Sequence, residues 1–480
     1  MKNRTPSTNL SAEDLCFTPA VELREMLRGK LISPVELVQI FLERIERVNP
    51  KINAYCTLVP EMALELARKA QSAIMRGEAG MLCGLPVSIK DVTLTAGIRT
   101  TFGSKLYEHF VPDTDELIVE RLKEAGAVVL GKTNTPEFAA GGSTFNKVFG
   151  ITRNPWNTDF TVGGSSGGAA AAVAAGLGPL ATGSDLGGSL RLPASFCGVV
   201  GLRPSPGRVP RHPYKLNWDD LSVQGPIART VADTALMLEA ISGPDSRSPV
   251  SWPEKTSFLE AVQNPEVKNL RIAWSDNLNL MPVEQEVLEI TRSAIEVFRN
   301  LGTEVSEDTP DFSGAKEVAL TLRGLRFVAL YQDQMADPEF KRWVNPLVQG
   351  NIEQGLKLSV RDIARAQRQR SEIWDRVRTF FDKYDLLLTP TTPIPPFPAE
   401  TQYPTEIAGQ PMASYIDWAM LTYAITVVGL PAISVPCGWT KQGLPVGLQI
   451  VARRHDEAAL LRAAAAYESA APWAGRRPPL

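Results

Sequence analysis

Histidine is scarce in this sequence, and the common metal-binding patterns are missing from it. The 480 residues include three histidines, His109, His212 and His455. The sequence has no HExxH pair, no CxxC pair of a zinc site and no Walker loop for a nucleotide phosphate. We therefore expect no metal ion and no cofactor. With only three histidines, the sequence also gives little support to a hydrolase whose catalytic base is a histidine.

Paired cysteines and an excess of one charge are also lacking. The five cysteines are odd in number and scattered, which indicates free core thiols in a reducing compartment rather than disulfides. Lysine and arginine number 50 against 53 acidic residues, a formal charge of -3. Such a chain has no basic field to bind nucleic acid or an anionic membrane surface.

Long apolar runs are absent as well. The longest small apolar stretch, residues 169–177, is about half of the roughly 18 to 20 residues that a membrane span needs. Residues 1–14 are polar and lack the apolar centre of a signal peptide. These features predict a cytoplasmic protein without a membrane anchor.

The remaining composition and the order of elements predict one large α/β domain. Hydrophobic residues make up 44% of the chain and charged residues 21%, an ordinary balance for a globular protein. A helix over 115–125 is followed at once by a strand over 127–130, as in an α/β sheet. We expect a single domain over 1–480, in which a charged helical segment at about 314–384 covers part of the sheet and the entrance to the site.

Residues 163–167, Gly-Gly-Ser-Ser-Gly, match the GxSxG nucleophile elbow of α/β-hydrolases. That fold requires an acid and then a histidine after the serine, and His212 and His455 both lie downstream. The following helix, however, begins with glycine and alanine, and no convincing pair of an acid and a histidine stands at strand ends. An esterase with Ser165 as nucleophile is therefore an alternative that the motif leaves open.

A second glycine-rich turn, from Asp185 to Ser189, is a better candidate for catalysis. It follows an expected strand at 180–183, and its two glycines let the chain turn without Cβ clashes. The backbone N–H groups of residues 186–189 can converge in such a turn, which is how backbone donors form an oxyanion hole. The same pattern also fits an ordinary glycine turn that buries a serine.

Lys90 ends an apolar segment, residues 84–89, and is followed by Asp91. Burial of a lysine disfavours its charged form, and lowering its pKa by about three units costs roughly 4 kcal/mol. A fold tolerates this cost chiefly where a neutral amine serves as a base. Two simpler alternatives are that Lys90 extends its amine to solvent or pairs with Asp91.

Taken together, these segments resemble the amidase-signature family, and the spacing of Lys90, Ser165 and Ser189 agrees with the family pattern. The resembling segments are residues 84–90, 163–207, 429–436 and 443–449. The likeness extends over nearly the whole chain and is weakest between 245 and 430. It implies the family's fold, a large mixed twisted β-sheet surrounded by α-helices, with a signature core at about 84–207.

The resemblance also implies roles for single residues. Ser189 matches the nucleophile that forms an acyl-enzyme, and Ser165 matches a serine with a cis peptide bond that relays the proton. Lys90 matches the base, which must be neutral; the relay running backwards protonates the leaving amine. Asp185 and Arg191 are expected to brace the loop. The amides of the oxyanion hole are matched by Leu186, Gly187, Gly188 and Ser189.

The family includes stand-alone amidases and the glutamyl-tRNA amidotransferase A subunit, which draws ammonia from glutamine and works in a complex. Leu186 and Leu192 lie near the nucleophile, where we expect more polar side chains in that subunit, and residues 208–222 depart from its usual sequence. A stand-alone amidase therefore fits better, with a small-molecule amide or carbamate as substrate. The partner-dependent A subunit stays open, and so does a homodimer.

The substrate pocket is predicted from a few aromatic side chains. Trp218, Trp418 and Tyr415 are candidates to line it, together with the proline-rich loop after Leu388, although most aromatic residues are simply core. Ala139 aligns with a substrate contact of the family. An aromatic pocket favours aryl amides, or carbamates such as urethane fragments, which some family members hydrolyse by the same acyl chemistry.

Overall fold

The centre of the computed structural model is a sheet of eleven strands. The structure describes residues 10–254 and 256–480, so part of the polar N-terminal segment considered above, residues 1–9, lies outside it. In spatial order the strands are β1 (Tyr55–Leu58), β3 (Val128–Thr133), β2 (Pro86–Lys90), β8 (Leu180–Asp185), β10 (Val223–Ala228), β9 (Val200–Arg203), β16 (Ala432–Trp439), β17 (Pro445–Ala452), β13 (Leu386–Pro390), β11 (Arg271–Trp274) and β12 (Glu304–Glu307).

The sheet is mixed. β2 pairs parallel with both β3 and β8, and β13, β11 and β12 pair parallel at the other end. The strands between these two groups, from β8 to β13, pair antiparallel. β2, β8, β10 and β13 are apolar along most of their length, because helices flank the sheet and leave few polar positions. The predicted fold class, a large mixed sheet surrounded by helices, is confirmed.

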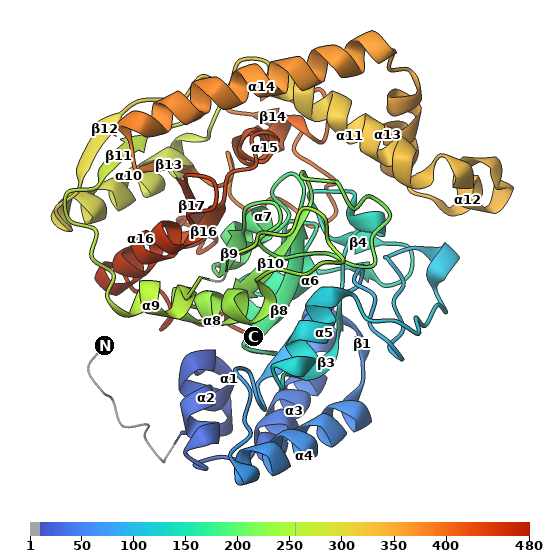
Figure 1. Cartoon of the computed structure of the whole chain (residues 1–480), viewed down its shortest axis with the longest axis vertical. Coiled ribbons are helices and arrows are strands. Elements are labelled where there is room, and N and C mark those ends of the chain that lie inside the picture. Colours follow the sequence, from blue (N-terminus) through green and yellow to red (C-terminus); the bar gives the residue numbers. More distant parts are fainter. Residues whose placement is uncertain (1–9, 255) are drawn as a thin grey trace.

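Helices are present along the whole chain (Figure 1). They are α1 (Ala12–Phe17), α2 (Ala20–Arg28), α3 (Pro34–Ile52), α4 (Pro60–Arg76), α5 (Leu117–Glu124), α6 (Gly167–Ala174), α7 (Arg191–Cys197), α8 (Val231–Ile241), α9 (Phe258–Gln263), α10 (Gln285–Asn300), α11 (Ala315–Tyr331), α12 (Pro338–Trp343), α13 (Pro346–Leu356), α14 (Val360–Lys383), α15 (Met420–Val427) and α16 (Glu457–Ala470). Short 3-10 turns and two-stranded hairpins complete the chain.

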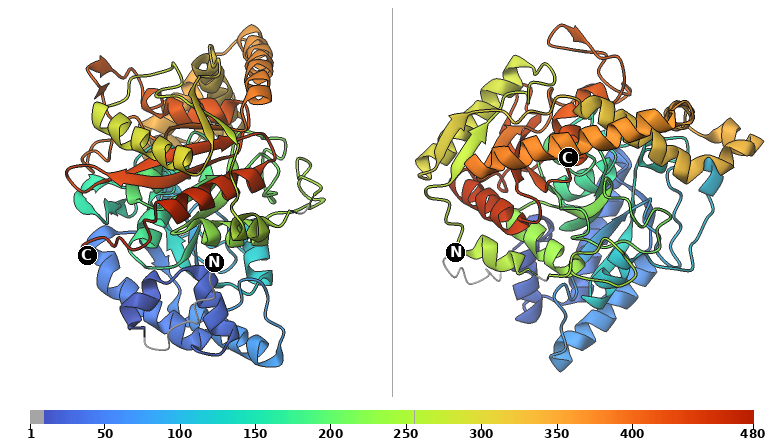
Figure 2. Two further views of the ribbon diagram at one scale, coloured as in Figure 1. Left: turned by 90° about the vertical axis from the view of Figure 1, so that its left-hand side faces the viewer. Right: turned by 45° about the horizontal axis from the view of Figure 1, so that its top comes forward.

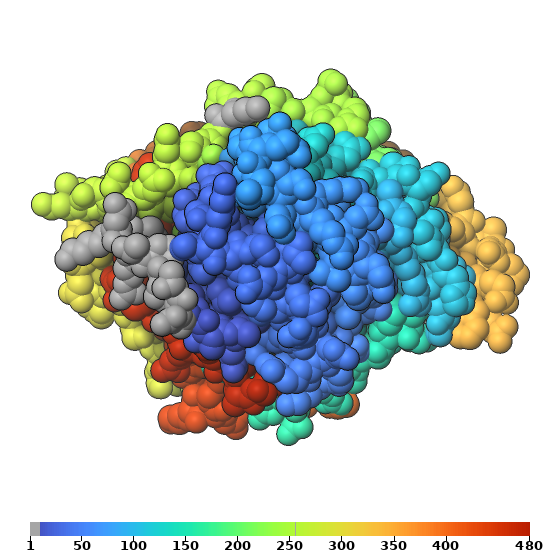
Figure 3. Space-filling view, turned by 90° about the horizontal axis from the view of Figure 1, so that it is seen from below, coloured from blue at the N-terminus to red at the C-terminus, as the bar shows by residue number. Residues whose placement is uncertain are grey.

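The N-terminal helices and the long helix α14 lie at opposite ends of the molecule (Figure 1). Figure 2 shows the sheet and its helices from two further directions, with the blue N-terminal helices again remote from the orange α14. Seen from below, the N-terminal segment forms one broad surface, coloured blue in Figure 3. The sheet lies between these two helical parts (Figure 1).

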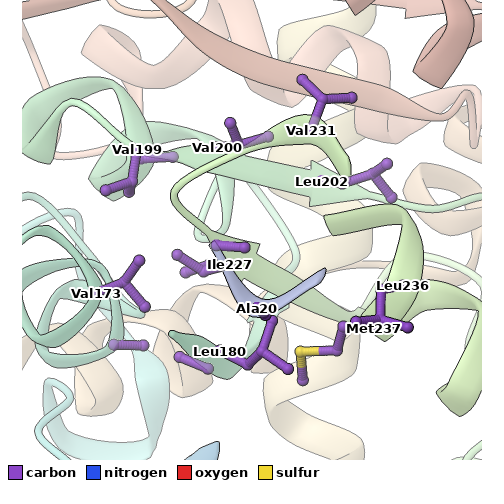
Figure 4. Packing of buried hydrophobic residues seen from close by; sticks show 14 of the residues in the cluster. Ala20, Val173, Leu180, Val199, Val200, Leu202, Ile227, Val231, Leu236 and Met237 are labelled. Carbon is purple, nitrogen blue, oxygen red and sulfur yellow. The ribbon is translucent and has the colours of Figure 1, made fainter. Parts of the chain in front are cut away.

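Alternate residues of the C-terminal strands pack into two different cores. Leu386 and Leu388 belong to a core that includes α8 and α16, whereas Leu387 belongs to one with α11, α14 and α15. Ile450 and Val451 divide in the same way. Because successive strand residues point to opposite faces, the two cores lie on the two faces of this part of the sheet. Figure 4 shows the first core around β8, β9, β10 and α8.

The segment expected to be helical, about 314–384, folds into α11, α12, α13 and α14. α14 starts with a capping box, in which Ser359 and Asp362 satisfy each other's backbone N–H groups. Its buried stripe, which includes Ile373 and Val377, packs into the second core. The assignment of all 480 residues to one domain stays a prediction.

In the described part of the chain, no helix is both long enough and apolar enough to cross a membrane. The five cysteines are free thiols, as expected. The cytoplasmic location stays a prediction from the sequence.

Candidate active site

Lys90 is completely buried at the end of β2, next to the parallel strand β8. Its Nζ lies 2.7 Å from Ser165 Oγ and 2.9 Å from the hydroxyls of both Ser166 and Ser184. The amine therefore does not reach solvent. It does not pair with Asp91 either, because that carboxylate accepts hydrogen bonds from Thr101.

Burial lowers the pKa of Lys90 to about 7, although the negative charge of Asp185 opposes this shift. A neutral amine has two N–H donors and one lone pair, whereas an ammonium group has only donors. Three hydroxyls around Nζ match the neutral form well, since one of them can donate to the lone pair and two can accept. The geometry thus allows Lys90 to accept a proton from Ser165.

Ser165 follows a cis peptide bond after Gly164 and leads into α6. The two glycines that begin α6 let it lie against the neighbouring loop: a Cβ at Gly167 would be 2.2 Å from Thr144 Oγ1, and one at Gly168 would be 2.4 Å from the Asn134 amide. Close packing therefore explains the glycine that ends the GxSxG pattern, Gly167, without a catalytic elbow. His455 stacks on Trp252 far along the chain, and no histidine of the described residues lines the cavity at Ser165, so an esterase elbow has no imidazole partner.

Ser189 is half-buried in the turn between β8 and α7 and faces the same cavity as Ser165. The turn requires its glycines. A Cβ at Gly187 would be 2.4 Å from the ring of Tyr423, and Gly188 has a φ of 116° and lies against Thr422. The absence of side chains at these two positions lets the turn pack closely against α15.

One of the four amides predicted for the oxyanion hole is already used. The Gly188 N–H donates to Asp185 Oδ1 at 2.9 Å, so it does not point to a substrate. The N–H groups of Leu186, Gly187 and Ser189 have no acceptor within the described residues. The predicted set of four donors is therefore reduced to three.

Asp185 and Arg191 brace the turn, as expected from the sequence. Arg191 donates from Nε and Nη2 to the Asp185 carboxylate at 3.0 and 2.9 Å, and Arg203 lies 3.3 Å from it. Burial alone would raise the pKa of Asp185, but the two guanidinium groups outweigh it and hold this pKa well below its usual range. Arg191 also donates to Gln449 on β17 at 2.7 Å, which ties the turn to the sheet.

Two cavities meet at Ser189. The larger has a volume of about 330 Å³ and is lined by Ser165, Ser184 and Ser189, by several aromatic rings, and by polar groups such as Arg211 and Gln224. Its aromatic residues are Phe102, Tyr107, Phe110, Phe138, Tyr214, Phe327 and Tyr331. The smaller has about 40 Å³ and is lined by glycine and apolar residues together with Arg323, Tyr415 and Tyr423. Ala139, Leu186, Ser189 and Arg323 line both.

The aromatic residues proposed from the sequence lie in different places. Trp218 is 78% exposed and outside the lining of both cavities, so it is not kept as a pocket residue. Trp418 is fully buried beneath the wall of the small cavity, where a Cβ at Gly142 would be 2.4 Å from its ring. Tyr415 lines the small cavity directly. Ala139 has a φ of 57° and lines both cavities.

Several cavity residues were not predicted from the sequence. Arg323, Phe327 and Tyr331 come from α11, and Phe102 and Phe110 come from the loop after β2. The pattern of α11 is that of any partly buried helix, so no local signal distinguishes the positions that face a cavity. Metal-binding clusters of three or more histidine, cysteine or acidic residues are absent from the described residues.

The chain matches the protein-family model named Amidase over residues 36–461. It belongs to the amidase family. The resemblance to amidase-signature enzymes is thus confirmed, and the protein is a hydrolase of carbon–nitrogen bonds other than peptide bonds.

Individual proteins resemble the chain over almost its full length. An acylamidase of Rhodococcus erythropolis is 38% identical, with 98% of each chain covered. The A subunit of the glutamyl-tRNA(Gln) amidotransferase of Moorella thermoacetica is 40% identical over 97% of this chain and 99% of its own. The crystal structure of a bacterial aryl acylamidase of the amidase-signature family superposes with a TM-score of 0.90 at 33% identity, covering 97% of this chain and 99% of that one.

Proposed function

We propose that this amidase hydrolyses aryl amides and aryl carbamates that carry a small acyl group, with Ser189 as nucleophile, Ser165 as proton relay and Lys90 as base. The observation that carries the proposal is the contact of Lys90 Nζ with Ser165 Oγ, in a buried setting that favours a neutral amine, beside a cavity that Ser189 also lines. Serine activated by a neighbouring base is a general route to an acyl-enzyme.

In the proposed reaction, Ser165 passes its proton to Lys90 Nζ and takes the proton of Ser189 Oγ. Ser189 Oγ then bonds to the carbonyl carbon, and the negative oxygen that results accepts hydrogen bonds from backbone N–H groups. The proton returns through Ser165 to the nitrogen, the C–N bond breaks, and the amine leaves. Water next attacks the acyl-enzyme by the same relay. A carbamate gives a carbonate half-ester in this last step.

Three backbone amides are available for the oxyanion, those of Leu186, Gly187 and Ser189. Removal of a single such donor typically costs about 3 kcal/mol of transition-state stabilisation. The buried pair of Asp185 and Arg191 holds the turn, and the Gly188 amide is part of this brace rather than of the donor set. The donors are thus fixed before a substrate arrives.

The two cavities suggest which side of the substrate lies where. Ser165 must protonate the leaving nitrogen, and it lines the large cavity but is not part of the lining of the small one. The amine therefore leaves through the large aromatic cavity, where an aryl ring can stack. The acyl group then occupies the small cavity of about 40 Å³, which limits its size. The names of two relatives, an acylamidase and an aryl acylamidase, support this assignment.

The test is hydrolysis of acetanilide, longer acyl anilides and an alkyl N-phenylcarbamate by the wild type and the Ser189→Ala variant, with release of aniline measured. A serine-directed fluorophosphonate followed by mass spectrometry locates the nucleophile. We expect labelling at Ser189, cleavage that falls as the acyl group lengthens, and no cleavage by the variant. Labelling at Ser165 together with an active Ser189→Ala variant would contradict the proposal.

A second candidate function is that of the A subunit in a glutamyl-tRNA amidotransferase, because one such protein is 40% identical to the chain. The acyl part of glutamine carries both a carboxylate and an ammonium group, and the lining of the small cavity contains no acidic residue to pair with the ammonium group. The leaving group from glutamine is ammonia, which is too small to contact the rings of the large aromatic cavity. Glutamine hydrolysis that appears only on addition of partner subunits, with no anilide cleavage, would favour this second function.

A further inference from the structure

The small cavity beside Ser189 contains a buried cation without an acidic partner. Arg323 on α11 is 6% exposed and lines both cavities. Two acids of segments that pack nearby are engaged elsewhere: Asp417 pairs with Lys316, and Asp219 pairs with Arg326. Within the described residues no carboxylate lies in ion-pair distance of Arg323, which is costly for a buried charge.

The groups that do contact Arg323 are neutral. Its Nε lies 2.8 Å from Asn351 Oδ1, its Nη2 lies 2.5 Å from the Tyr415 hydroxyl, and its Nη1 lies 3.4 Å from the Tyr423 hydroxyl. Asn351 Nδ2 also donates to the Tyr415 hydroxyl at 2.6 Å. The Tyr415 oxygen thus accepts from two side chains, and the hydrogen of its own hydroxyl is left to donate to a further group.

The polar side chains of the small cavity are therefore all able to donate hydrogen bonds, and none is acidic. They are Arg323, Tyr415, Tyr423 and Ser189, and the other lining residues are glycine or apolar. A donor-rich site with one positive charge and no acid recognises an anionic oxygen ligand. A volume of about 40 Å³ holds roughly three water-sized groups, which is the size of a carboxylate.

We propose that this cavity selects acyl groups that end in a carboxylate, so that the enzyme favours half-amides of short dicarboxylic acids. The substrate carboxylate pairs with Arg323 and accepts hydrogen bonds from Tyr415 and Tyr423. This inference rests on the proposed function, since it assumes that the acyl group lies in the small cavity. Because Ser189 itself lines this cavity, we expect a carboxylate bound there to be separated from the scissile carbonyl by a short chain.

The test compares two anilides of equal size that differ in charge. Malonic acid monoanilide ends in a carboxylate, and isovaleranilide ends in an isopropyl group of the same shape. We expect kcat/KM of the wild type to be at least about tenfold higher for the charged substrate, the effect of one charge-assisted hydrogen bond or more. The ratio of the two kcat/KM values should fall to about one in Arg323→Met and recover in part in Arg323→Lys.

A matched control is Arg368→Met, the same substitution at a side chain that is 73% exposed on α14; it should keep the wild-type ratio. Tyr415→Phe, which removes only the hydroxyl, should lower the ratio even if Arg323→Met does not fold. Equal or better hydrolysis of isovaleranilide by the wild type would overturn the inference and leave the proposed function intact.

Failure of the proposed function gives a different result, namely no release of aniline from either anilide or from acetanilide. Calorimetric titration of the Ser189→Ala variant with the two anilides then decides the inference without turnover. Tighter binding of the charged anilide that is lost with Arg323→Met supports the carboxylate site. Equal binding of both, or no binding of the charged one, contradicts it.

Discussion

Burial lowers the pKa of Lys90 to about 7, and the side chain of Ser165 lies 2.7 Å from its amine. In water the same amine would be protonated at neutral pH and could not accept a proton. The hydroxyls of Ser166 and Ser184 replace part of the lost hydration without adding charge. The environment of one residue therefore determines the pH range in which the proposed relay can start.

We expect kcat/KM to depend on pH through the protonation state of Lys90, because only the neutral amine can accept a proton. Below about pH 7 the amine of the free enzyme becomes charged, so kcat/KM should fall about tenfold per pH unit, whereas above pH 7 it should level off. The Arg211 charge helps to lower the pKa of Lys90, so Arg211→Met should move the bend to higher pH. A pH profile of anilide hydrolysis measures both. A bend that stays in place when Arg211 is replaced would contradict this origin.

Among single residues, the sequence predicts those whose role depends on their immediate neighbours in the chain. Lys90 at a strand end, and the serines beside their glycines, are recognisable because the motif itself builds the turn. Arg323 could not be found in this way, since its importance depends on two cavities that segments from across the chain enclose. Trp218 was misplaced because an aromatic residue in a loop is equally compatible with a pocket or, as observed, with the surface.

The contact between α11 and α13 depends on two glycines. A Cβ at Gly355 would be 2.3 Å from the Gly324 carbonyl oxygen, so the helices lie backbone to backbone. This close approach places Asn351 of α13 next to Arg323 of α11 at 2.8 Å. The packing of two helices thereby positions the cation of the small cavity.

Gly355→Ala should separate these helices. We expect it to lower the free energy of unfolding by about 1 to 3 kcal/mol, as overpacking does, and to reduce the preference for a charged acyl group. The control is Gly350→Ala on the same helix, where a Cβ would meet no atom within 4 Å. That substitution should leave stability unchanged or raise it by up to about 1 kcal/mol. Urea denaturation measures both, and equal effects of the two substitutions would argue against the close contact.

Helices were easier to predict than their arrangement. A serine followed by a proline is typical of a helix start. At the start of α3 the Ser33 hydroxyl accepts a hydrogen bond from the Glu36 amide, and Pro34 is the first helical residue. The order of strands could not be derived, because β10 is inserted between β8 and β9 in the sheet although it follows β9 in the chain. Pairing of this kind depends on contacts between distant segments and has no local signature.

For the molecule as a whole, the two cores share the same strands, since Leu387 lies in one and Leu388 in the other. If either core were disrupted, the shared strands would lose their packing on one face, and the other core would be destabilised as well. We therefore expect all parts of the described structure to unfold together in urea, with tryptophan fluorescence and far-ultraviolet circular dichroism giving one coincident transition.

Matched variants extend this measurement. Leu387→Ala and Leu388→Ala remove side chains from opposite faces, and each should lower the free energy of unfolding by about 2 to 5 kcal/mol and shift both signals together. Two separate transitions, or a variant that shifts only one signal, would indicate independent units and contradict the prediction of a single domain.

The indole of Trp418 packs against Gly142, which lines the small cavity, and the indole itself is not part of the lining. The ring of Trp418 therefore supports the cavity wall without being part of the lining. If the acyl group lies in this cavity as proposed, an exchange of this ring for a slimmer or bulkier one would change the room for the acyl group while the lining side chains stay the same.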